Sequence, residues 1–171
     1  MSILDTRIHR RIIADIRRYS DHAGVPQHAI SNGLEHYCGQ SEIDWVVRYL
    51  RARANPPVPV GLAYMGDWGD MTRRMVGIAG CMVRNFVDAR VMTVQRATDE
   101  MATCTLLLIP RIPTGKALLD WKVSQLVDLL TDRMNADKCT VVAIGKNLEA
   151  LKVDHGQDLA EAVGRYEVLK P

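Results

Sequence analysis

The sequence predicts an α/β fold in which helices cover both faces of a parallel sheet. Short apolar runs bounded by turns alternate with longer segments whose apolar residues recur at helical spacing. The pattern predicts a buried strand over residues 58–65, a helix over 71–87, and further strands over 89–95, 105–109 and 140–145. Because strand and helix alternate, the strands are expected to run parallel, with helices crossing over the sheet.

Two helices are expected before the first strand. The first spans residues 5–19, where isoleucines follow one helical stripe and arginines surround them. The second ends near Ala54, because a residue that precedes a proline, here Asn55, is pushed out of the α region. The isoleucine stripe of the first helix consists of Ile8, Ile12, Ile13 and Ile16.

The turn at residues 66–73, Gly-Asp-Trp-Gly-Asp-Met-Thr-Arg, lies where P-loop proteins bind nucleotide phosphate. A working P-loop reads G-x-x-x-x-G-K-[ST], because its backbone N–H groups cradle the phosphates, its Lys meets the terminal phosphates and its Ser or Thr ligates magnesium. Gly66 is kept, but Met71, Thr72 and Arg73 stand at the second Gly, the Lys and the Ser/Thr positions. The loop keeps the position of a P-loop but lacks the residues that bind phosphate and magnesium.

The apolar run 105–109 is followed by Pro110 and Arg111. A magnesium-dependent ATPase ends the corresponding strand with Asp and Glu, which hold the metal and polarise water. Both acids are missing here, and one position carries a base.

Further features follow in order around these two positions. They are an arginine-rich start, a Cys38-Gly39-Gln40 segment that opens a helix, a long helix through Trp121 and Leu130, the strand 140–145, and the segments 147–151 and 156–160. From about Arg10 to the C-terminus, this order resembles the AAA+ ATPase core of bacterial replicative-helicase loaders of the DnaC/DnaI type and the related IstB transposition ATPases. The resemblance implies a P-loop NTPase-like, AAA+-like sheet with a degenerate nucleotide site.

The resemblance also implies two further positions that depart from the family. In the family, the strand at 140–145 carries a polar sensor residue, and the following helix carries an arginine that completes a neighbour's ATP site. This chain has Gly145 at the first place and Asp158 or Ala162 at the second. We therefore expect a pseudo-ATPase with no catalytic residue, no cofactor and no metal. The vestigial nucleotide site is predicted to comprise Gly66, Gly69, Met71, Thr72, Arg73, Pro110, Arg111 and Gly145.

We expect this vestigial site to be closed by its own side chains. Asp67 and Asp70 on the loop should form charge-assisted hydrogen bonds with Arg73 and Arg111, and Trp68 should cover the same space. The alternative is that all four charges are solvated at the edge of the sheet.

The predicted function is protein binding in DNA replication. Sixteen of the 22 basic residues are arginines, and five of these fall within the first 18 positions. We assign residues 1–36 to an N-terminal arginine-rich helix and loop, and residues 37–171 to an AAA+-like core that lacks a helical lid. A solvated charged face is the alternative interpretation of the helix. The predicted partner-binding residues are Arg10, Arg11, Arg17 and Arg18.

The expected partner is a replicative helicase or a helicase loader, in a protein of phage or mobile-element origin. One alternative is an arginine-rich nucleic-acid-binding protein, distinguished by a steep dependence of binding on salt. Direct DNA binding is disfavoured, because residues 96–103 are too few for the helical insertion with which the family binds single strands. The other alternative is a divergent ATPase in which Asp67, Asp70 or Glu149 replaces the missing acids.

The composition agrees with one cytoplasmic domain. The chain has 171 residues, of which 47% are hydrophobic and 25% charged, enough to bury a sizeable core. We expect no secretory signal and no membrane association, because Asp5 interrupts the start and no long uncharged apolar stretch follows. The cysteines and histidines form no zinc-like set, so Cys38, Cys81, Cys104 and Cys139 are expected to be free thiols of the core.

Overall fold

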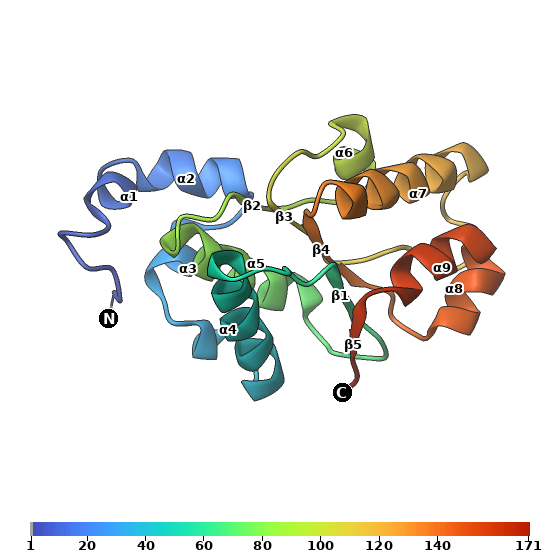
Figure 1. The fold of residues 1–171 in the computed structure, drawn as a ribbon, viewed down its shortest axis with the longest axis horizontal. Coiled ribbons are helices and arrows are strands. Elements are labelled where there is room, and N and C mark those ends of the chain that lie inside the picture. Colours follow the sequence, from blue (N-terminus) through green and yellow to red (C-terminus); the bar gives the residue numbers. More distant parts are fainter. Residues whose placement is uncertain (1) are drawn as a thin grey trace.

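A computed structural model describes residues 2–171, and within them a five-stranded parallel sheet has the order β2-β3-β4-β1-β5 (Figure 1). The predicted parallel α/β sheet is confirmed. The strands are β1 (Gly61–Tyr64), β2 (Ala89–Val91), β3 (Leu106–Ile109), β4 (Cys139–Ala143) and β5 (Glu167–Leu169).

Helices precede, connect and follow these strands. None of those in residues 2–171 is long and apolar enough to cross a membrane. They are α1 (Arg10–Ala14), α2 (Ile16–Ala23), α3 (Gln27–Ser31), the short 3-10 helix η1 (Leu34–His36), α4 (Gln40–Ala54), α5 (Met71–Arg84), α6 (Val94–Asp99), α7 (Asp120–Asn135), α8 (Leu148–His155) and α9 (Gln157–Gly164).

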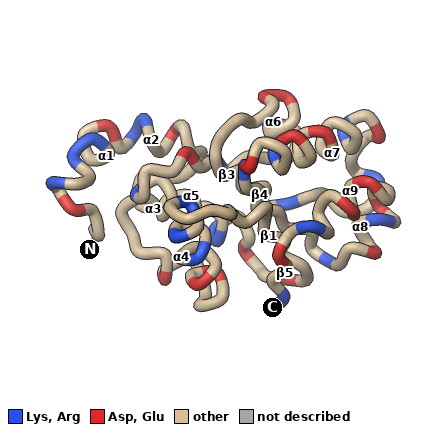
Figure 2. Tube along the Cα trace, in the orientation of Figure 1, with Lys and Arg blue, Asp and Glu red and all other residues tan. Residues whose placement is uncertain are grey.

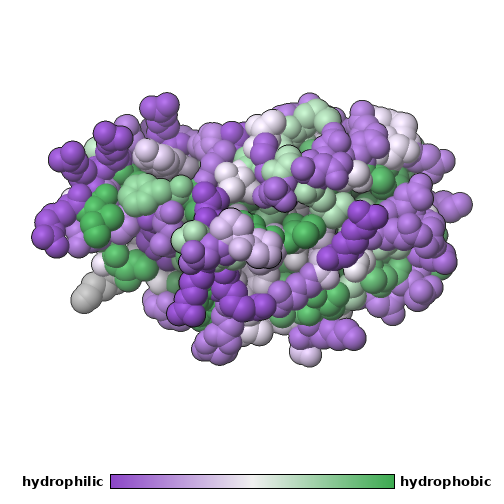
Figure 3. Space-filling view, viewed as in Figure 1, coloured by the Kyte–Doolittle hydropathy of each residue, from purple (hydrophilic) through white to green (hydrophobic). Residues whose placement is uncertain are grey.

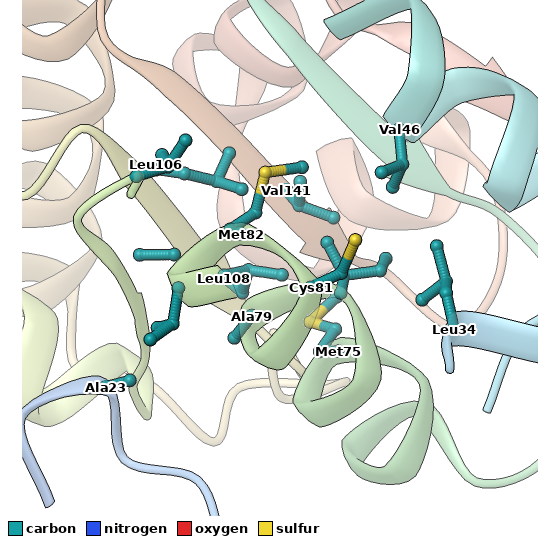
Figure 4. Packing of buried hydrophobic residues seen from close by; sticks show 14 of the residues in the cluster. Ala23, Leu34, Val46, Met75, Ala79, Cys81, Met82, Leu106, Leu108 and Val141 are labelled. Carbon is teal, nitrogen blue, oxygen red and sulfur yellow. The ribbon is translucent and has the colours of Figure 1, made fainter. Parts of the chain in front are cut away.

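Alternate residues of the central strands bury two separate cores. Leu106 and Leu108 of β3 pack with residues of α2 to α5 on one face, as Figure 4 shows in close view. Leu107 and Ile109 point to the other face and pack with α6 to α9. Because β1, β3 and β4 are buried on both faces, their sequences are almost entirely apolar, with Thr140 of β4 as the polar exception. The four cysteines are buried and free, as predicted.

The expected helix over residues 5–19 is wrong in its extent. It begins at Arg10 and breaks at Asp15, whose φ of −121° and ψ of 31° lie outside the helical region, and α2 then continues to Ala23. The predicted stripe is only partly buried, because Ile12 is 1% exposed whereas Ile8 and Ile13 remain on the surface.

The expected strand over residues 89–95 is also too long. It ends at Val91, because Thr93 caps a new helix by accepting a hydrogen bond from the Arg96 N–H at 3.3 Å. The segment between the second and third strands therefore holds α6, which packs against α7.

Residues before the first strand pack directly on the sheet-covering helices. Arg84 near the end of α5 is buried, and its guanidinium donates to the carbonyls of Ala29, Ile30 and Asn32 at 3.1, 2.8 and 2.7 Å. These bonds satisfy carbonyls at the end of α3, which have no partner within that helix. The α3 segment and α5 are thereby held together, while a domain boundary at residues 36/37 stays a prediction.

The strand β5 was not predicted. It pairs with β1 at the sheet edge, and Glu167 at its start forms an ion pair with Arg48 of α4 at 2.5 Å. Its three residues are too few for a clear alternation of apolar and polar side chains.

Candidate functional site

The predicted nucleotide position lies at the carboxyl ends of β1, β3 and β4. Ligands bind there in open α/β sheets, because the loops that leave adjacent parallel strands meet at this edge. A cavity of about 490 Å³ opens between the loop after β1, the segment after β3 and the end of β4. Of the vestigial site residues, the structure brings together Gly66, Gly69, Met71, Thr72, Pro110, Arg111 and Gly145 around this cavity.

The loop between β1 and α5 holds its shape through its own hydrogen bonds. Gly66 and Gly69 have φ values of 91° and 68°, which few other residues adopt. The Asp67 carboxylate accepts from the Gly69 N–H at 2.9 Å, and the Trp68 indole N–H donates to the Met65 carbonyl at 3.0 Å. The loop thus keeps the strand-turn-helix geometry of a P-loop with a different set of groups.

Asp70 occupies the N-cap of α5. Its carboxylate accepts a hydrogen bond from the Arg73 N–H at 2.9 Å. In a working P-loop, the first N–H groups of this helix face the phosphates of the nucleotide. One of these donors is therefore used by a carboxylate of the protein, which adds negative charge at the place of the phosphates.

Arg73 is the one vestigial residue that does not line the cavity. Its guanidinium donates to the His36 carbonyl and lies 5.9 Å from the centre of the Tyr37 ring. Arg111 lines the cavity and is exposed. None of the ion pairs found in residues 2–171 joins Asp67 or Asp70 to an arginine. The expectation that these charges close the site is wrong, because each carboxylate accepts a hydrogen bond from a nearby backbone N–H instead.

Sequence reasoning missed a buried network behind the loop. The Glu42 side chain is fully buried, and its two carboxylate oxygens accept from Arg74 Nη1 at 2.8 and 2.7 Å. The Gly39 N–H donates to Glu42 at 2.6 Å, and the Tyr64 hydroxyl donates to it at 3.1 Å. The signal for it is Glu42 at the third helical position after Gly39, where a glutamate caps the start of its own helix.

Trp68 connects this network to the cavity. Its ring meets Tyr64 edge to face at 5.1 Å, and the Arg74 guanidinium lies 5.2 Å from the centre of the Trp68 ring. Burial raises the pKa of the Tyr64 hydroxyl, and the negative Glu42 raises it further. Tyr64 therefore remains a hydrogen-bond donor to Glu42, and the loop is anchored from behind.

The positions after β3 and β4 supply neither carboxylates nor amide side chains. Pro110 and Arg111 follow β3, and Gly145, with a φ of 68°, follows β4. Residues 2–171 contain no group of three or more His, Cys, Asp or Glu side chains that could hold a metal ion. Glu149, a proposed substitute acid, lies in α8 beside a separate cavity.

Several solved structures that resemble this chain are replication proteins. It matches DnaI with a TM-score of 0.62 and 14% identity over 85% of this chain and 90% of that chain. It matches the DnaC helicase loader with a TM-score of 0.55 and 16% identity over 90% of this chain and 98% of that chain. This chain has the DnaC/DnaI-like AAA+ fold.

Replication initiators share the AAA+ fold over part of their length. DnaA from Aquifex aeolicus, solved with AMPPCP bound, matches with a TM-score of 0.60 and 10% identity over 81% of this chain. The present chain spans about half of two initiator structures, 48% of one replication initiation factor and 49% of that DnaA. No protein-family model and no curated protein sequence matches this chain.

The predicted partner-binding arginines lie away from the AAA+ nucleotide position. Arg10, Arg11, Arg17 and Arg18 are exposed on α1 and α2, at the end of the molecule opposite α8 and α9 (Figure 2). Arg17 approaches Asp21 at 3.9 Å, and the other three form no ion pair within residues 2–171.

Proposed function

We propose that this chain is a catalytically inactive AAA+-like protein that binds a replicative helicase or a helicase loader and modulates DNA replication. The observation that carries the proposal is the hydrogen bond from the Arg73 N–H to the Asp70 carboxylate at the start of α5. It places a fixed negative charge where the fold would otherwise bind phosphate.

Electrostatics disfavours a nucleotide at this position. Asp67 and Asp70 line the cavity, and the P-loop lysine that would offset nucleotide charge is replaced by Thr72. Carboxylates beside a bound phosphate repel it, although solvent screens exposed charges. Within residues 2–171, Arg111 is the one basic side chain in the lining, and Pro110 and Arg111 offer no carboxylate for magnesium, so we expect nucleotide binding to be weak.

Partner binding fits what remains of the loader-like fold. The likeness to DnaI and DnaC covers most of this chain and of those chains, which supports a role that uses the shared fold. The proposal is that the nucleotide chemistry is lost and protein binding is kept. A protein of this kind would act by occupying the place of a loader subunit. The exposed arginines of α1 and α2 are the proposed contact residues.

Two measurements test this function. Equilibrium titration with labelled ATP and magnesium should detect no binding at micromolar concentrations, and a micromolar dissociation constant would overturn the inactive assignment. Light scattering after mixing with the purified replicative helicase or loader of the same host should detect a complex. If no complex forms with the helicase and none forms with the loader, the partner assignment is overturned.

Nucleic-acid binding is the second candidate, favoured by the arginines of α1 and α2 that lack an ion-pair partner in residues 2–171. The property that would identify this function is an affinity for single-stranded DNA that falls steeply as the salt concentration increases. Tight, salt-sensitive DNA binding together with no helicase or loader complex would favour this candidate.

A further inference from the structure

Phe86 is the only phenylalanine of the chain, and it stands where a helix usually ends in glycine. Its φ is 57°, in the left-handed region. The Phe86 N–H donates to the Val83 carbonyl at 3.0 Å, and the Val87 N–H donates to the Met82 carbonyl at 2.9 Å. This pair of bonds is the Schellman ending of α5, and glycine is favoured at its left-handed position because a Cβ atom is strained there.

Burial does not account for the aromatic residue. The Phe86 side chain is 61% exposed, whereas an aromatic ring stabilises a fold mainly by leaving water. A residue that is strained by its backbone and leaves most of its ring in water gains little from burial within the monomer. Such a residue is a candidate for a role outside the folding of its own chain.

The Phe86 ring is held against the start of α1. It stacks on His9 with a centroid distance of 5.8 Å and an interplanar angle of 16°. His9 is fixed on both sides, because its Nδ1 accepts from the Asp5 N–H at 2.9 Å and its Nε2 donates to the Arg84 carbonyl at 3.1 Å. The N-terminal segment and the end of α5 therefore present one continuous surface.

Two exposed isoleucines lie close to His9 along the chain. Ile13 lies one turn after His9 on the same side of α1, because the Ile13 N–H donates to the His9 carbonyl at 2.8 Å. Ile13 is 40% exposed, and Ile8, next to His9, is 62% exposed. Figure 3 shows hydrophobic atoms at this end of the molecule with hydrophilic atoms around them. We name Ile8, His9, Ile13 and Phe86 the Phe86 patch.

In residues 5–15, which carry most of the Phe86 patch, three arginines outnumber the two aspartates, Asp5 and Asp15. Arg10 and Arg11 are exposed and form no ion pair within residues 2–171. The nearby Asp5 carboxylate already accepts from the N–H groups of Arg7 and Ile8 at 2.7 and 3.2 Å. The charge that complements this surface is negative.

We propose that the Phe86 patch docks an acidic amphipathic helix of the protein partner. Apolar side chains at helical spacing on that helix cover Phe86, Ile8 and Ile13, and its carboxylates meet Arg10 and Arg11. The inference rests on the proposed function in one respect, that the chain acts by binding a protein.

A synthetic helical peptide provides the first test. The probe has leucines at positions i, i+3, i+4 and i+7 and glutamates on its other face, and its affinity is measured by fluorescence anisotropy. The protein is expected to bind this peptide at least about tenfold more tightly than a scrambled peptide or one with lysines in place of the glutamates. Equal binding of all three peptides, or preference for the lysine peptide, overturns the proposal.

The variant Phe86→Gly tests the patch without harming the fold. Glycine suits the left-handed position, so the melting temperature should be unchanged or higher, while peptide affinity falls at least about tenfold. The matched control is Met101→Gly, because Met101 has a φ of 44°, is 50% exposed and ends α6 with the same pair of backbone bonds. Met101→Gly should bind the peptide as wild type does.

The same variants separate this inference from the proposed function. If the helicase or loader binds wild type and Phe86→Gly equally, the Phe86 patch is wrong and the function stands. If neither protein binds wild type but the acidic peptide does so through Phe86, the patch stands and the partner assignment fails.

Discussion

The carboxylate of Glu42 and the guanidinium of Arg74 join α4 to α5 behind the degenerate nucleotide loop. Glu42 is fully buried, and one Arg74 nitrogen lies 2.8 and 2.7 Å from its two oxygens. Arg74 also donates to the Trp68 carbonyl at 3.1 Å, so the pair positions the loop as well as the helices.

Breaking this pair from one side should destabilise the protein. Arg74→Met leaves the buried Glu42 charge without its main partner, and the free energy of unfolding is expected to fall by about 3 kcal/mol. Urea denaturation followed by tryptophan fluorescence measures it. The double variant Glu42→Gln with Arg74→Met should recover part of the loss, and strictly additive single effects would argue against coupling.

Restoring the P-loop sequence alone should not restore nucleotide binding. The triple variant Met71→Gly, Thr72→Lys and Arg73→Thr recreates the missing motif but keeps the Asp70 carboxylate at the helix start. Adding Asp70→Ser should give an ATP affinity about tenfold higher than that of the triple variant, because serine caps the helix without a charge. Equal ATP affinity of the triple and quadruple variants, measured by labelled-nucleotide titration, would show that Asp70 does not block the site.

Lys122 should make stability depend on pH through Asp99. The buried Lys122 ammonium lies 2.6 Å from the Asp99 carboxylate, and this hydrogen bond holds the pKa of Asp99 below its usual value of 3.8. A depressed pKa stabilises the fold above pH 3.8, and the contribution is lost as pH falls through the folded pKa. Unfolding at a series of pH values between about 5 and 3 should be less pH-dependent in Asp99→Asn than in wild type.

The four cysteines should resist alkylation in the folded protein. Burial raises the pKa of each thiol, to about 12 for Cys38 and Cys139, so little thiolate exists at neutral pH. Iodoacetamide at about pH 8 should modify native protein far more slowly than protein in urea. Mass spectrometry counts the modified thiols, and rapid labelling of native Cys38 or Cys139 would contradict the buried assignment.

The N-terminal arginines should matter for binding more than for stability. Replacing Arg10, Arg11, Arg17 and Arg18 by alanine should change the free energy of unfolding by less than about 0.5 kcal/mol for each residue. Capture of the helicase or loader partner should weaken, because an arginine at the centre of an interface contributes about 2 kcal/mol or more. Unchanged capture would place the docking surface elsewhere.

Ile12→Asp provides the control for this arginine set. Ile12 is 1% exposed in the core beneath α1, so a charge there should detach or unfold the helix. The melting temperature should fall for this variant alone.

The spacing of apolar residues along the sequence explains which helices and strands could be predicted. The strands β1, β3 and β4 are almost entirely apolar because both of their faces are covered, and α4, α5 and α7 are long enough for a clear helical period. The break at Asp15 and the end of β2 at Val91 depend on single caps and turns. Hydrophobic patterns carry little information about such boundaries.

The sequence by itself determined the AAA+-like framework and the identity of the residues at the former nucleotide position. Order and spacing along the chain are local properties, and a missing lysine or acid is visible without coordinates. Only the tertiary structure decided where the remaining charges went. The Arg73 guanidinium donates to the His36 carbonyl, Arg74 pairs with Glu42, and the Asp70 carboxylate caps α5. Each charged group bonds to a partner that the folded chain holds next to it, and such contacts between distant residues are not visible in the sequence. The stacking of Phe86 on His9 likewise joins residues 77 positions apart, a contact that arises only when α1 folds against the end of α5.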